Sequence, residues 1–558
     1  MPVKTTIKSL KISGIIFIGI LFLFSVAFAS PVTRLSSDIQ VNLAEKILVE
    51  NPTQVFGTKL YTFSELRSFY VSVRFKANWV NNDSSYFNMG ALMDMLNQAE
   101  NDGLIIRDYH REVLKHEISL YDQWIYSAQY DSLADLDILL TDAALSYAED
   151  ISVGQLYSQD DNVNRKEILK PVSYVSGLKL ALDSGQVCEW LRAMPPNRIE
   201  YEDLKNELGV YKEIYANGGW IKLDFDVTKI RLGDTGQKVI KLRRRLIQTG
   251  DLKMILLADS NIFDSALATS IRNFQIRFGI KPTGYITGNT LVAMNSPIEE
   301  RIANIMGSIE RLRWLPEDSG QKYVQVNISD FALHVVENHR SQLRMKVIVG
   351  KPYKQTPVFQ ATMKTVVINP SWEVPRSIIS EEMLPKLQKN PGYLAHEHLK
   401  LLDYKGNEIN PDTVKWSRMT QDNFKYRIVQ IPGAWNSLGR VKFLFPNSYD
   451  VYLHGTPEQY LFAKDVRTFS HGCMRVENPT LLAACLLKDQ GYDKEQIEEQ
   501  IKEETETQIS LKHHIPVYVT YLTAWVDDAG QLCFRNDIYN RDNIFLEYVI
   551  KHAALDGI

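Results

Sequence analysis

A cysteine flanked by histidines is the feature of this sequence best suited to covalent chemistry. Residues 470–476 read S-H-G-C-M-R-V, and an H-G-T begins upstream at His454, where an apolar run ends. A cysteine thiol with a pKa of about 8.5 is only a few per cent thiolate at neutral pH. A nearby imidazole can accept the thiol proton and later return it to a leaving amine. The pattern therefore indicates a thiol nucleophile, Cys473, served by a histidine base.

Two further residues of this motif suit an attack on a carbonyl group. Gly472 has no side chain, so a backbone or a substrate can come close to Cys473. Successive backbone N–H groups around Gly472 and Cys473 are placed to hold an oxyanion. Arg475 offers a planar fork of N–H donors, which is typical of a site for a substrate carboxylate.

The sequence does not indicate metal, nucleotide or serine-hydrolase chemistry. The triplet His396-Glu397-His398 has neither H-E-x-x-H spacing nor a third ligand, and we interpret His513-His514 as a surface pair. There is no C-x-x-C, no G-x-x-x-x-G-K-[ST] and no G-x-S-x-G. A papain-like protease needs a histidine far downstream of its cysteine, and the histidines after Cys473, at positions 513, 514 and 552, all lie within 79 residues of it. We therefore expect no metal and no organic cofactor.

The motif S-H-G-C-M-R-V with its upstream H-G-T resembles the catalytic domain of the L,D-transpeptidases. Residues 432–439, P-G-A-W-N-S-L-G, are also similar to that family's lead-in to its histidine strand. The likeness spans residues 320 to about 526, apart from an insertion. A buried structural cysteine beside a core histidine is the simpler alternative, but it does not explain a match along the whole motif.

The resemblance implies a role for each residue of the motif. Cys473 is the expected nucleophile, and His454 is the expected proton acceptor and donor. His471 corresponds to the family's second histidine, which shapes the pocket, and Arg475 to the arginine that orients the substrate. The residues expected to bind the substrate or the oxyanion are thus Ser470, His471, Gly472 and Arg475.

The resemblance implies murein L,D-transpeptidation as the reaction. Cys473 is expected to attack the carbonyl that joins the third residue of a stem tetrapeptide to its terminal D-Ala, and an amine of a neighbouring stem then gives a 3→3 cross-link. The same acyl-enzyme passed to water makes an L,D-carboxypeptidase, and a non-enzymatic wall-binding scaffold is a third alternative. Peptidoglycan stem peptides and glycan are the expected partners. The acceptor stays open between a stem, a lipoprotein and a free D-amino acid.

The motif lies in a region that begins near residue 320, where apolar residues recur with the period of two that is typical of strands. The expected strands are Tyr323–Ile328, Ala332–Val336, Arg344–Val349, Thr365–Ile368, Val441–Phe445, Val451–Leu453 and Val517–Trp525. Residues 377–425 interrupt them with helix-like sequence at Glu381–Leu387 and His396–Leu402. An insertion of this length is more often a lid or a binding element than an idle loop. We therefore predict a β-rich catalytic domain over 320–526 with a helical lid, followed by a C-terminal segment over 527–558.

A compact helical unit over residues 228–297 precedes the β-rich domain. It is expected to hold three helices, with Asp264 and Thr287 as the N-caps of the second and third. Its pattern G-x-x-G-x-x-V-x-x-L, F-Q-x-x-x-G, T-G and T-L resembles the peptidoglycan-binding domain. An ordinary helical bundle is the simpler interpretation, but the layout of the chain is similar to that of large L,D-transpeptidases. Residues 298–319 are interpreted as a helical connector.

The beginning of the chain has the features of an export signal. Three lysines precede an uncharged stretch at 12–29, and A-F-A at 27–29 suits a signal peptidase. We predict a signal peptide over 1–29 and localisation to the periplasm or cell envelope. Membrane association is expected only if this segment stays uncleaved. Residues 30–227 are predicted to form a helical scaffold, with helices at Leu133–Gln155 and Leu178–Leu191.

Composition agrees with an α+β multidomain protein. At about 150 residues per domain, 558 residues suggest three or four domains. The 63 Lys and Arg against 67 Asp and Glu give a near-balance that argues against nucleic-acid binding. Four cysteines are too few for a disulfide scaffold. We expect Cys188, Cys485 and Cys533 to be small buried residues.

Overall fold

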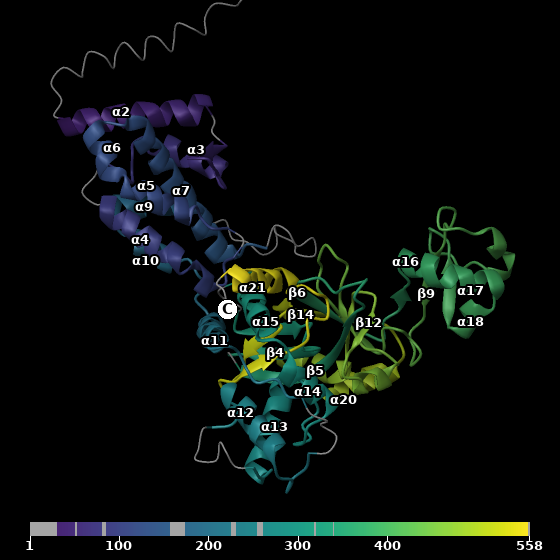
Figure 1. Cartoon of the computed structure of the whole chain (residues 1–558). Coiled ribbons are helices and arrows are strands. Elements are labelled where there is room, and N and C mark those ends of the chain that lie inside the picture. Colours follow the sequence, from purple (N-terminus) through teal and green to yellow (C-terminus); the bar gives the residue numbers. More distant parts are fainter. Residues whose placement is uncertain are drawn as a thin grey trace, which may run out of the picture. The chain divides into compact units, whose positions relative to one another are not determined.

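The computed structural model shows two compact units. It describes residues 31–50, 53–80, 85–105, 107–156, 173–224, 230–253, 261–316, 320–338 and 340–555. The signal peptide predicted over 1–29 lies outside these residues. One unit comprises Met1–Gln155 with Lys170–Asn197, and the other comprises Leu156–Leu169 with Arg198–Ile558. Figure 1 colours the chain by sequence, so that the elements of each unit are found by their colour.

The described part of the first unit is mainly helical. Its α-helices are α2 (Pro31–Glu45), α3 (Phe63–Ser72), α4 (Ser85–Asn97), α5 (Arg111–Ser119), α6 (Tyr121–Ser127), α7 (Tyr130–Val153), α9 (Tyr174–Ser184) and α10 (Val187–Arg192). Helix α7 confirms the helix expected near Leu133–Gln155 and is buried along most of its length. The helix expected over Leu178–Leu191 is instead two helices, because Gly185 ends α9 in the left-handed conformation.

Buried carboxylates on α7 hold the loops of this unit. Asp137 accepts hydrogen bonds from the N–H groups of Trp79 and Val80, at 2.8 and 3.2 Å. Asp142 accepts from the Thr62 N–H at 2.8 Å and lies 2.8 Å from His110. Burial of an unpaired carboxylate is costly, and these partners offset that cost. The buried acids therefore have a structural role, as expected for a scaffold.

The second unit begins with α11 (Ile199–Ala216) and a group of shorter helices. These are α12 (Gln237–Gln248), α13 (Ser265–Arg277) and α14 (Gly288–Asn295). The predicted caps are present: Asp264 accepts from the Leu267 N–H at 2.9 Å, and Thr287 accepts from the Thr290 N–H at 3.2 Å. Apolar residues at helical spacing, among them Leu242, Ile271 and Phe274, pack into one core.

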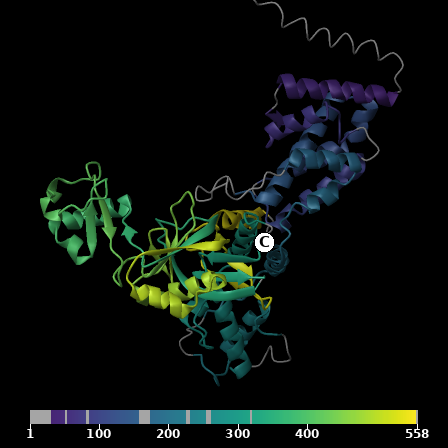
Figure 2. The ribbon, with the colours of Figure 1, turned by 180° about the vertical axis from the view of Figure 1, so that it is seen from behind.

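A nine-stranded sheet forms the centre of this unit. Its strands are β3 (Lys322–Asn327), β4 (Ala332–Glu337), β5 (Arg340–Gly350), β6 (Phe359–Ile368), β10 (Val441–Leu444), β11 (Leu453–His454), β12 (Thr468–Ser470), β13 (Met474–Val476) and β14 (Thr507–Thr520). The order is β12-β5-β13-β11-β10-β6-β14-β3-β4, and β4 also pairs with β5, so the strands other than β12 close into a ring. Figures 1 and 2 show this sheet from opposite sides.

The last strand of the sheet differs from the expectation. The sequence predicts a strand over Val517–Trp525, whereas β14 begins at Thr507 and ends at Thr520. Its first half alternates buried residues, such as Ile509 and Leu511, with exposed ones. β14 lies between β6, to which it is antiparallel, and β3, to which it is parallel.

The insertion folds around a small sheet of its own. Strands β7 (Trp372–Glu373), β8 (Leu399–Leu402) and β9 (Arg427–Gln430) pair in the order β7-β9-β8, and a separate apolar core includes Leu387 and Ile428. The helix expected over His396–Leu402 is therefore wrong for its second half. Leu399 and Leu401 are buried while Lys400 is exposed, which is the period of a strand. The other half of the insertion is helical, with η5 (Ile379–Met383) and α17 (Leu384–Lys389).

The C-terminal segment joins the sheet and the group of shorter helices. It contains β16 (Leu532–Phe534), which pairs with the preceding strand β15 (Ala524–Val526), and α21 (Asn543–Leu555), which packs on α15 (Ile298–Leu312). Arg535 donates to the Arg277 carbonyl at 2.9 Å, and the Phe278 and Phe534 rings stack 5.3 Å apart. α13, which carries Arg277, is thereby fixed to the C-terminal segment.

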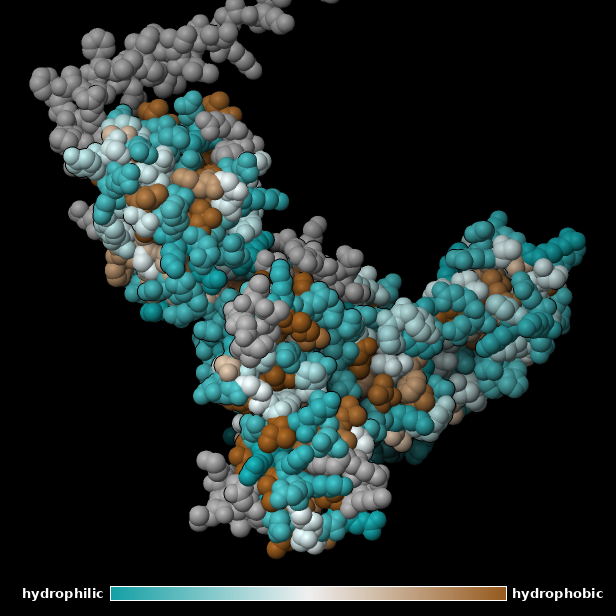
Figure 3. All heavy atoms as spheres, viewed as in Figure 1, coloured by the Kyte–Doolittle hydropathy of each residue, from teal (hydrophilic) through white to brown (hydrophobic). Residues whose placement is uncertain are grey.

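Among the helices that the structure describes, none combines the length and apolar character needed to cross a membrane. The face drawn in Figure 3 is mostly hydrophilic, with its hydrophobic residues in small groups. All four cysteines are free, and Cys533 is buried while Cys188 and Cys485 are partly buried.

Candidate active site

Strand pairing brings the two parts of the cysteine motif together. Cys473 lies in the tight turn between β12 and β13, and β13 pairs in parallel with β11. In that register His454 is the partner of Arg475. Gly472 has a φ of +119°, a conformation that side chains other than glycine rarely adopt, so the turn requires glycine. The structure thus places His454 on the strand next to the one that follows Cys473.

His454 is held as a neutral imidazole. Its Nδ1 lies 2.6 Å from the Gly455 carbonyl oxygen, which only accepts, so Nδ1 carries the proton and Nε2 is free to accept one. Burial, and then the positive charge of Arg475, lowers the pKa of His454 to about 3. At neutral pH this side chain is therefore an uncharged base.

Cys473 is also uncharged at rest. Burial raises the pKa of its thiol, and three opposing interactions limit the rise: the N–H and hydroxyl groups of Tyr452 bond to sulfur, and Lys442 is near enough to favour the thiolate. The Sγ atom lies 3.9 Å from the Asp450 carbonyl oxygen. A thiol beside a neutral imidazole favours proton transfer during attack rather than a preformed ion pair.

Lys442 and Tyr452 are site residues that the sequence analysis missed. Lys442 lies opposite His454 in the antiparallel pair β10–β11, and its Nζ sits 4.0 Å from the centre of the Tyr452 ring. Burial lowers the pKa of Lys442, against the opposing effect of Cys473. Two signals were available. Lysine interrupts the apolar strand V-K-F-L, and Tyr452 shares the strand face of His454 by the period of two.

Ser470 and Gly472 are bonded within the motif itself. The Ser470 hydroxyl accepts from the Gly472 N–H at 3.3 Å and donates to the Cys473 carbonyl at 2.5 Å. The N–H of Gly472 is therefore occupied, contrary to the expectation that both successive N–H groups face an oxyanion. Among the described residues, the Cys473 N–H has no acceptor.

His471 and Arg475 face other parts of the chain. The Nε2 of His471 lies 2.7 Å from a carboxylate oxygen of Glu382, which belongs to the insertion. The neighbouring Glu381 forms an ion pair with Lys354, on the loop after β5. Arg475 pairs with Glu458 at 2.5 Å, so its guanidinium already holds a carboxylate of this chain. Through Glu382, the insertion reaches the turn that holds Cys473.

The other histidine clusters have no site geometry. His396 contacts its neighbour Glu397 at 3.0 Å, and His398 stacks on Trp435 with ring centres 3.9 Å apart. Within the described residues, no group of three or more His, Cys, Asp or Glu side chains is arranged to hold a metal ion.

Comparison with known proteins identifies the parts of the chain. Residues 321–490 match the L,D-transpeptidase catalytic domain (YkuD), residues 64–208 match a scaffold domain, and residues 235–294 match the family described as "Putative peptidoglycan binding domain". A curated relative from Haemophilus influenzae, described as "Putative L,D-transpeptidase", is 34% identical over 233 residues, which are 42% of this chain and 47% of that protein. The matched region thus spans about half the length of this relative.

Two solved structures are similar at lower identity. The L,D-transpeptidase from Xylanimonas cellulosilytica is 14% identical, with 52% of this chain and 96% of that chain covered and a TM-score of 0.17. The L,D-transpeptidase from Stackebrandtia nassauensis is 15% identical, with 53% and 97% covered and a TM-score of 0.20. From the family matches, this chain contains an L,D-transpeptidase catalytic domain of the YkuD family, joined to a peptidoglycan-binding domain and a helical scaffold domain.

Proposed function

We propose that this chain is a murein L,D-transpeptidase that forms 3→3 cross-links through a thioester on Cys473. The observation that carries the proposal is the pairing of β11 with β13, which sets a neutral, buried His454 beside the turn that holds the thiol. The family matches support the same reaction class.

The proposed acylation step uses the thiol, the imidazole and one backbone N–H. As Sγ of Cys473 bonds to the carbonyl carbon before the terminal D-Ala, its proton passes to Nε2 of His454. The carbonyl oxygen becomes an oxyanion, which the Cys473 N–H binds. The carbon–nitrogen bond then breaks, the imidazolium returns the proton to nitrogen, and D-Ala leaves as a free amine. Lys442 and the Tyr452 hydroxyl stabilise negative charge on sulfur.

The second step consumes the thioester. An amine on the side chain of the third residue of another stem attacks the thioester carbonyl, His454 takes one of its protons, and Cys473 leaves and is reprotonated. Water in place of the amine gives hydrolysis. The contacts of Glu381 with Lys354 and of Glu382 with His471 support a role of the insertion as a lid, which would exclude water and favour the amine.

Mass spectrometry of the products of purified protein tests the proposal. With disaccharide tetrapeptide as substrate, we expect cross-linked dimers and one released D-Ala per link. Tripeptides without dimers indicate an L,D-carboxypeptidase. Unchanged tetrapeptide contradicts both activities and leaves a binding scaffold.

If peptidoglycan is the partner, the protein acts outside the cytoplasm. The two wall-related domains are typical of a cell-envelope protein. We assign residues 1–29 to export, in line with their lysines, uncharged stretch and A-F-A sequence.

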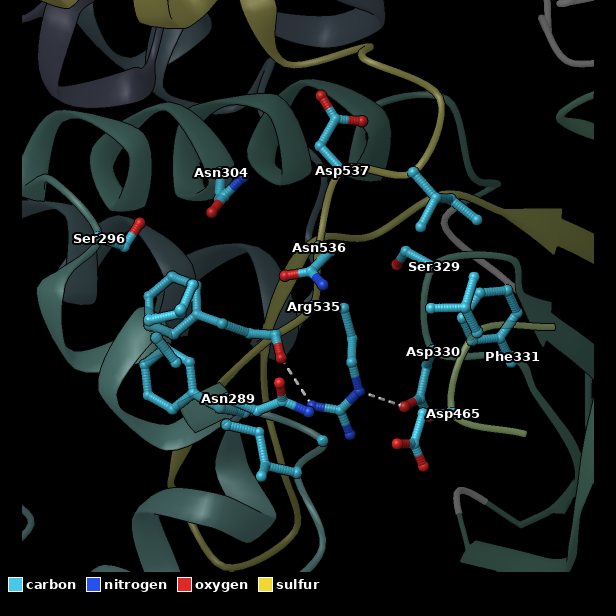
Figure 4. A pocket seen from close by; sticks show the side chains of 18 of the residues that line it. Asn289, Ser296, Asn304, Ser329, Asp330, Phe331, Asp465, Arg535, Asn536 and Asp537 are labelled. Carbon is cyan, nitrogen blue, oxygen red and sulfur yellow. Dashed lines mark hydrogen bonds and ion pairs between the residues drawn. The ribbon is translucent and has the colours of Figure 1, made fainter. Parts of the chain in front are cut away.

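A broad cavity next to the peptidoglycan-binding domain is our candidate for wall contact. It has a volume of about 1080 Å³ and is lined by this domain, by the turn between β3 and β4 and by the C-terminal segment. Figure 4 shows Arg535 bonded to Asp330, at 2.6 Å, with Asn289 and Asn536 close by. The lining also carries charged side chains, among them Lys281, Asp465 and Arg467, beside amides and the Tyr285 ring. This mixture suits the hydroxyl groups of a glycan and the charged groups of stem peptides.

Loss of this surface is expected to weaken wall binding. Tyr285→Ala combined with Asn289→Ala removes an exposed ring and an amide from the lining, and we expect at least about threefold less full-length protein to co-sediment with purified sacculi. Tyr126→Ala, which removes an equally large exposed ring in the first unit, is the control. Equal sedimentation of both variants contradicts the assignment of this cavity.

A carbapenem is expected to acylate Cys473 once per chain. Its lactam carbonyl takes the place of the scissile amide, the ring nitrogen receives the proton, and no leaving group departs. Intact-protein mass spectrometry should show one added drug mass in the wild type and none in Cys473→Ala. A label that persists in the variant places the adduct on another residue.

A further inference from the structure

We infer that Thr356 and Tyr539 are positioning residues that orient the peptide plane between Gly472 and Cys473, and so aim the N–H that binds the oxyanion. The inference deepens the proposed function and rests on it. It also gives the C-terminal segment, which lies beyond the matched catalytic range of 321–490, a part in catalysis.

Thr356 contacts the catalytic turn directly. Its side chain is fully buried, and its hydroxyl donates to the Gly472 carbonyl oxygen at 2.8 Å. The same hydroxyl accepts the N–H of Gly350, the last residue of β5, at 2.9 Å. A hydroxyl has one proton, so accepting from Gly350 leaves that proton directed at Gly472.

Tyr539 holds Thr356 from the other side. Its hydroxyl donates to the Gly350 carbonyl at 2.7 Å and accepts the Thr356 N–H at 3.2 Å. The two hydroxyls, Gly350 and the backbone of Thr356 thus form a closed set of hydrogen bonds with every donor used. The set fixes the rotamer and the backbone position of Thr356.

A peptide bond is planar and trans, so the Gly472 carbonyl and the Cys473 N–H point in opposite directions within one rigid plane. A hydrogen bond on that carbonyl therefore sets the direction of the N–H. It also polarises the amide, which makes the N–H a better donor. Since the Gly472 N–H is bonded to Ser470, the Cys473 N–H carries the oxyanion without help from its neighbour.

Arg541 adds a second tether between the same two segments. It donates to the side-chain oxygen of Gln355 at 3.0 and 3.3 Å. The backbone of the loop is also tightly folded, because a Cβ on Gly350 would lie 2.1 Å from the Lys354 carbonyl oxygen. The C-terminal segment therefore stabilises the loop that carries Gln355 and Thr356. That loop stabilises the turn that holds Cys473.

Two reagents separate orientation of the N–H from general damage. A carbapenem reacts through an oxyanion, whereas iodoacetamide alkylates sulfur with loss of iodide and forms no oxyanion. We would measure both second-order rate constants on full-length protein for Thr356→Val, which keeps the shape without the hydroxyl, and for Tyr539→Phe. Thr356→Ser restores a hydroxyl at the same place. Thr520→Val is the matched control. The buried hydroxyl of Thr520, on β14, donates to the Val326 carbonyl oxygen of β3 at 3.2 Å.

We expect carbapenem acylation to fall about 10-fold or more in Thr356→Val and Tyr539→Phe, since outright loss of an oxyanion donor costs about 10²–10³-fold. Alkylation should stay within about twofold, Thr356→Ser should recover most of the acylation rate, and Thr520→Val should change neither. Equal loss of both reactions, or no loss of acylation, overturns the inference. If Thr356→Val does not fold, Tyr539→Phe decides. If the carbapenem does not acylate Cys473 in the wild type, the proposed function itself is refuted. If the wild type is acylated and both variants keep the same rate, only this inference is refuted.

Discussion

Replacement of Cys473 with alanine should abolish cross-linking while the protein stays folded. Without sulfur no thioester forms, and loss of a covalent nucleophile lowers turnover by at least about 10⁴-fold. The side chain is small and only partly buried, so its truncation removes little packing. Dimer formation from disaccharide tetrapeptide, followed by mass spectrometry, gives the activity, and thermal unfolding gives the stability.

Cys485→Ala is the control for this substitution. Cys485 is also a free, partly buried thiol, but it lies on α19 (Pro479–Leu487), away from the turn. It should keep full activity. Retained 3→3 dimers in Cys473→Ala, or their loss in Cys485→Ala, would falsify the assignment of the nucleophile.

Replacement of His454 with alanine should lower acylation by about 10²–10⁴-fold, the usual contribution of a general base. Because burial holds the pKa of His454 at about 3, protonation of this base begins far below its ordinary value of 6.5. The wild-type rate should therefore show no loss from imidazole protonation between pH 7 and pH 5. The raised pKa of Cys473 makes the rate increase with pH above neutrality.

His471→Ala is the matched comparison, because His471 lies in the same motif but contacts the insertion through Glu382. It should lose less activity than His454→Ala. The wild-type rate could instead fall on acidification with a midpoint near pH 6.5. If His471→Ala keeps that midpoint, the result contradicts a neutral, buried base at position 454. A larger loss in His471→Ala transfers the role of base to His471.

The motif could be predicted from the sequence because its residues are contiguous or end one strand. Cys473 and Gly472 follow each other, and His454 is marked by the glycine after it. The supporting residues could not be predicted in this way. Lys442, Thr356 and Tyr539 come from separate segments, which only strand pairing and packing bring to the turn that holds Cys473. Nothing local in T-P-V or I-Y-N indicates a catalytic neighbour.

Parts of the fold were missed for a related reason. The strand β8 follows the charged H-E-H triplet and has only two buried residues, too short a pattern to separate from a helix. β14 begins just after an acidic run and includes His513 and His514 at its middle, so the alternation of its first part is hidden among polar residues. Both strands depend on partners far along the chain for their hydrogen bonds.

The place of β14 in the ring has a consequence for the order in which the sheet is completed. β14 is the last of the nine strands along the chain, yet in the sheet it lies between β6 and the first strand, β3. Contacts between segments this far apart form slowly, and domains fold in the order of their synthesis. While the chain is being synthesised, the turn that holds Cys473 therefore belongs to an unclosed sheet until residues 507–539 are free to join. We expect this turn to reach its final geometry only as a late event of folding.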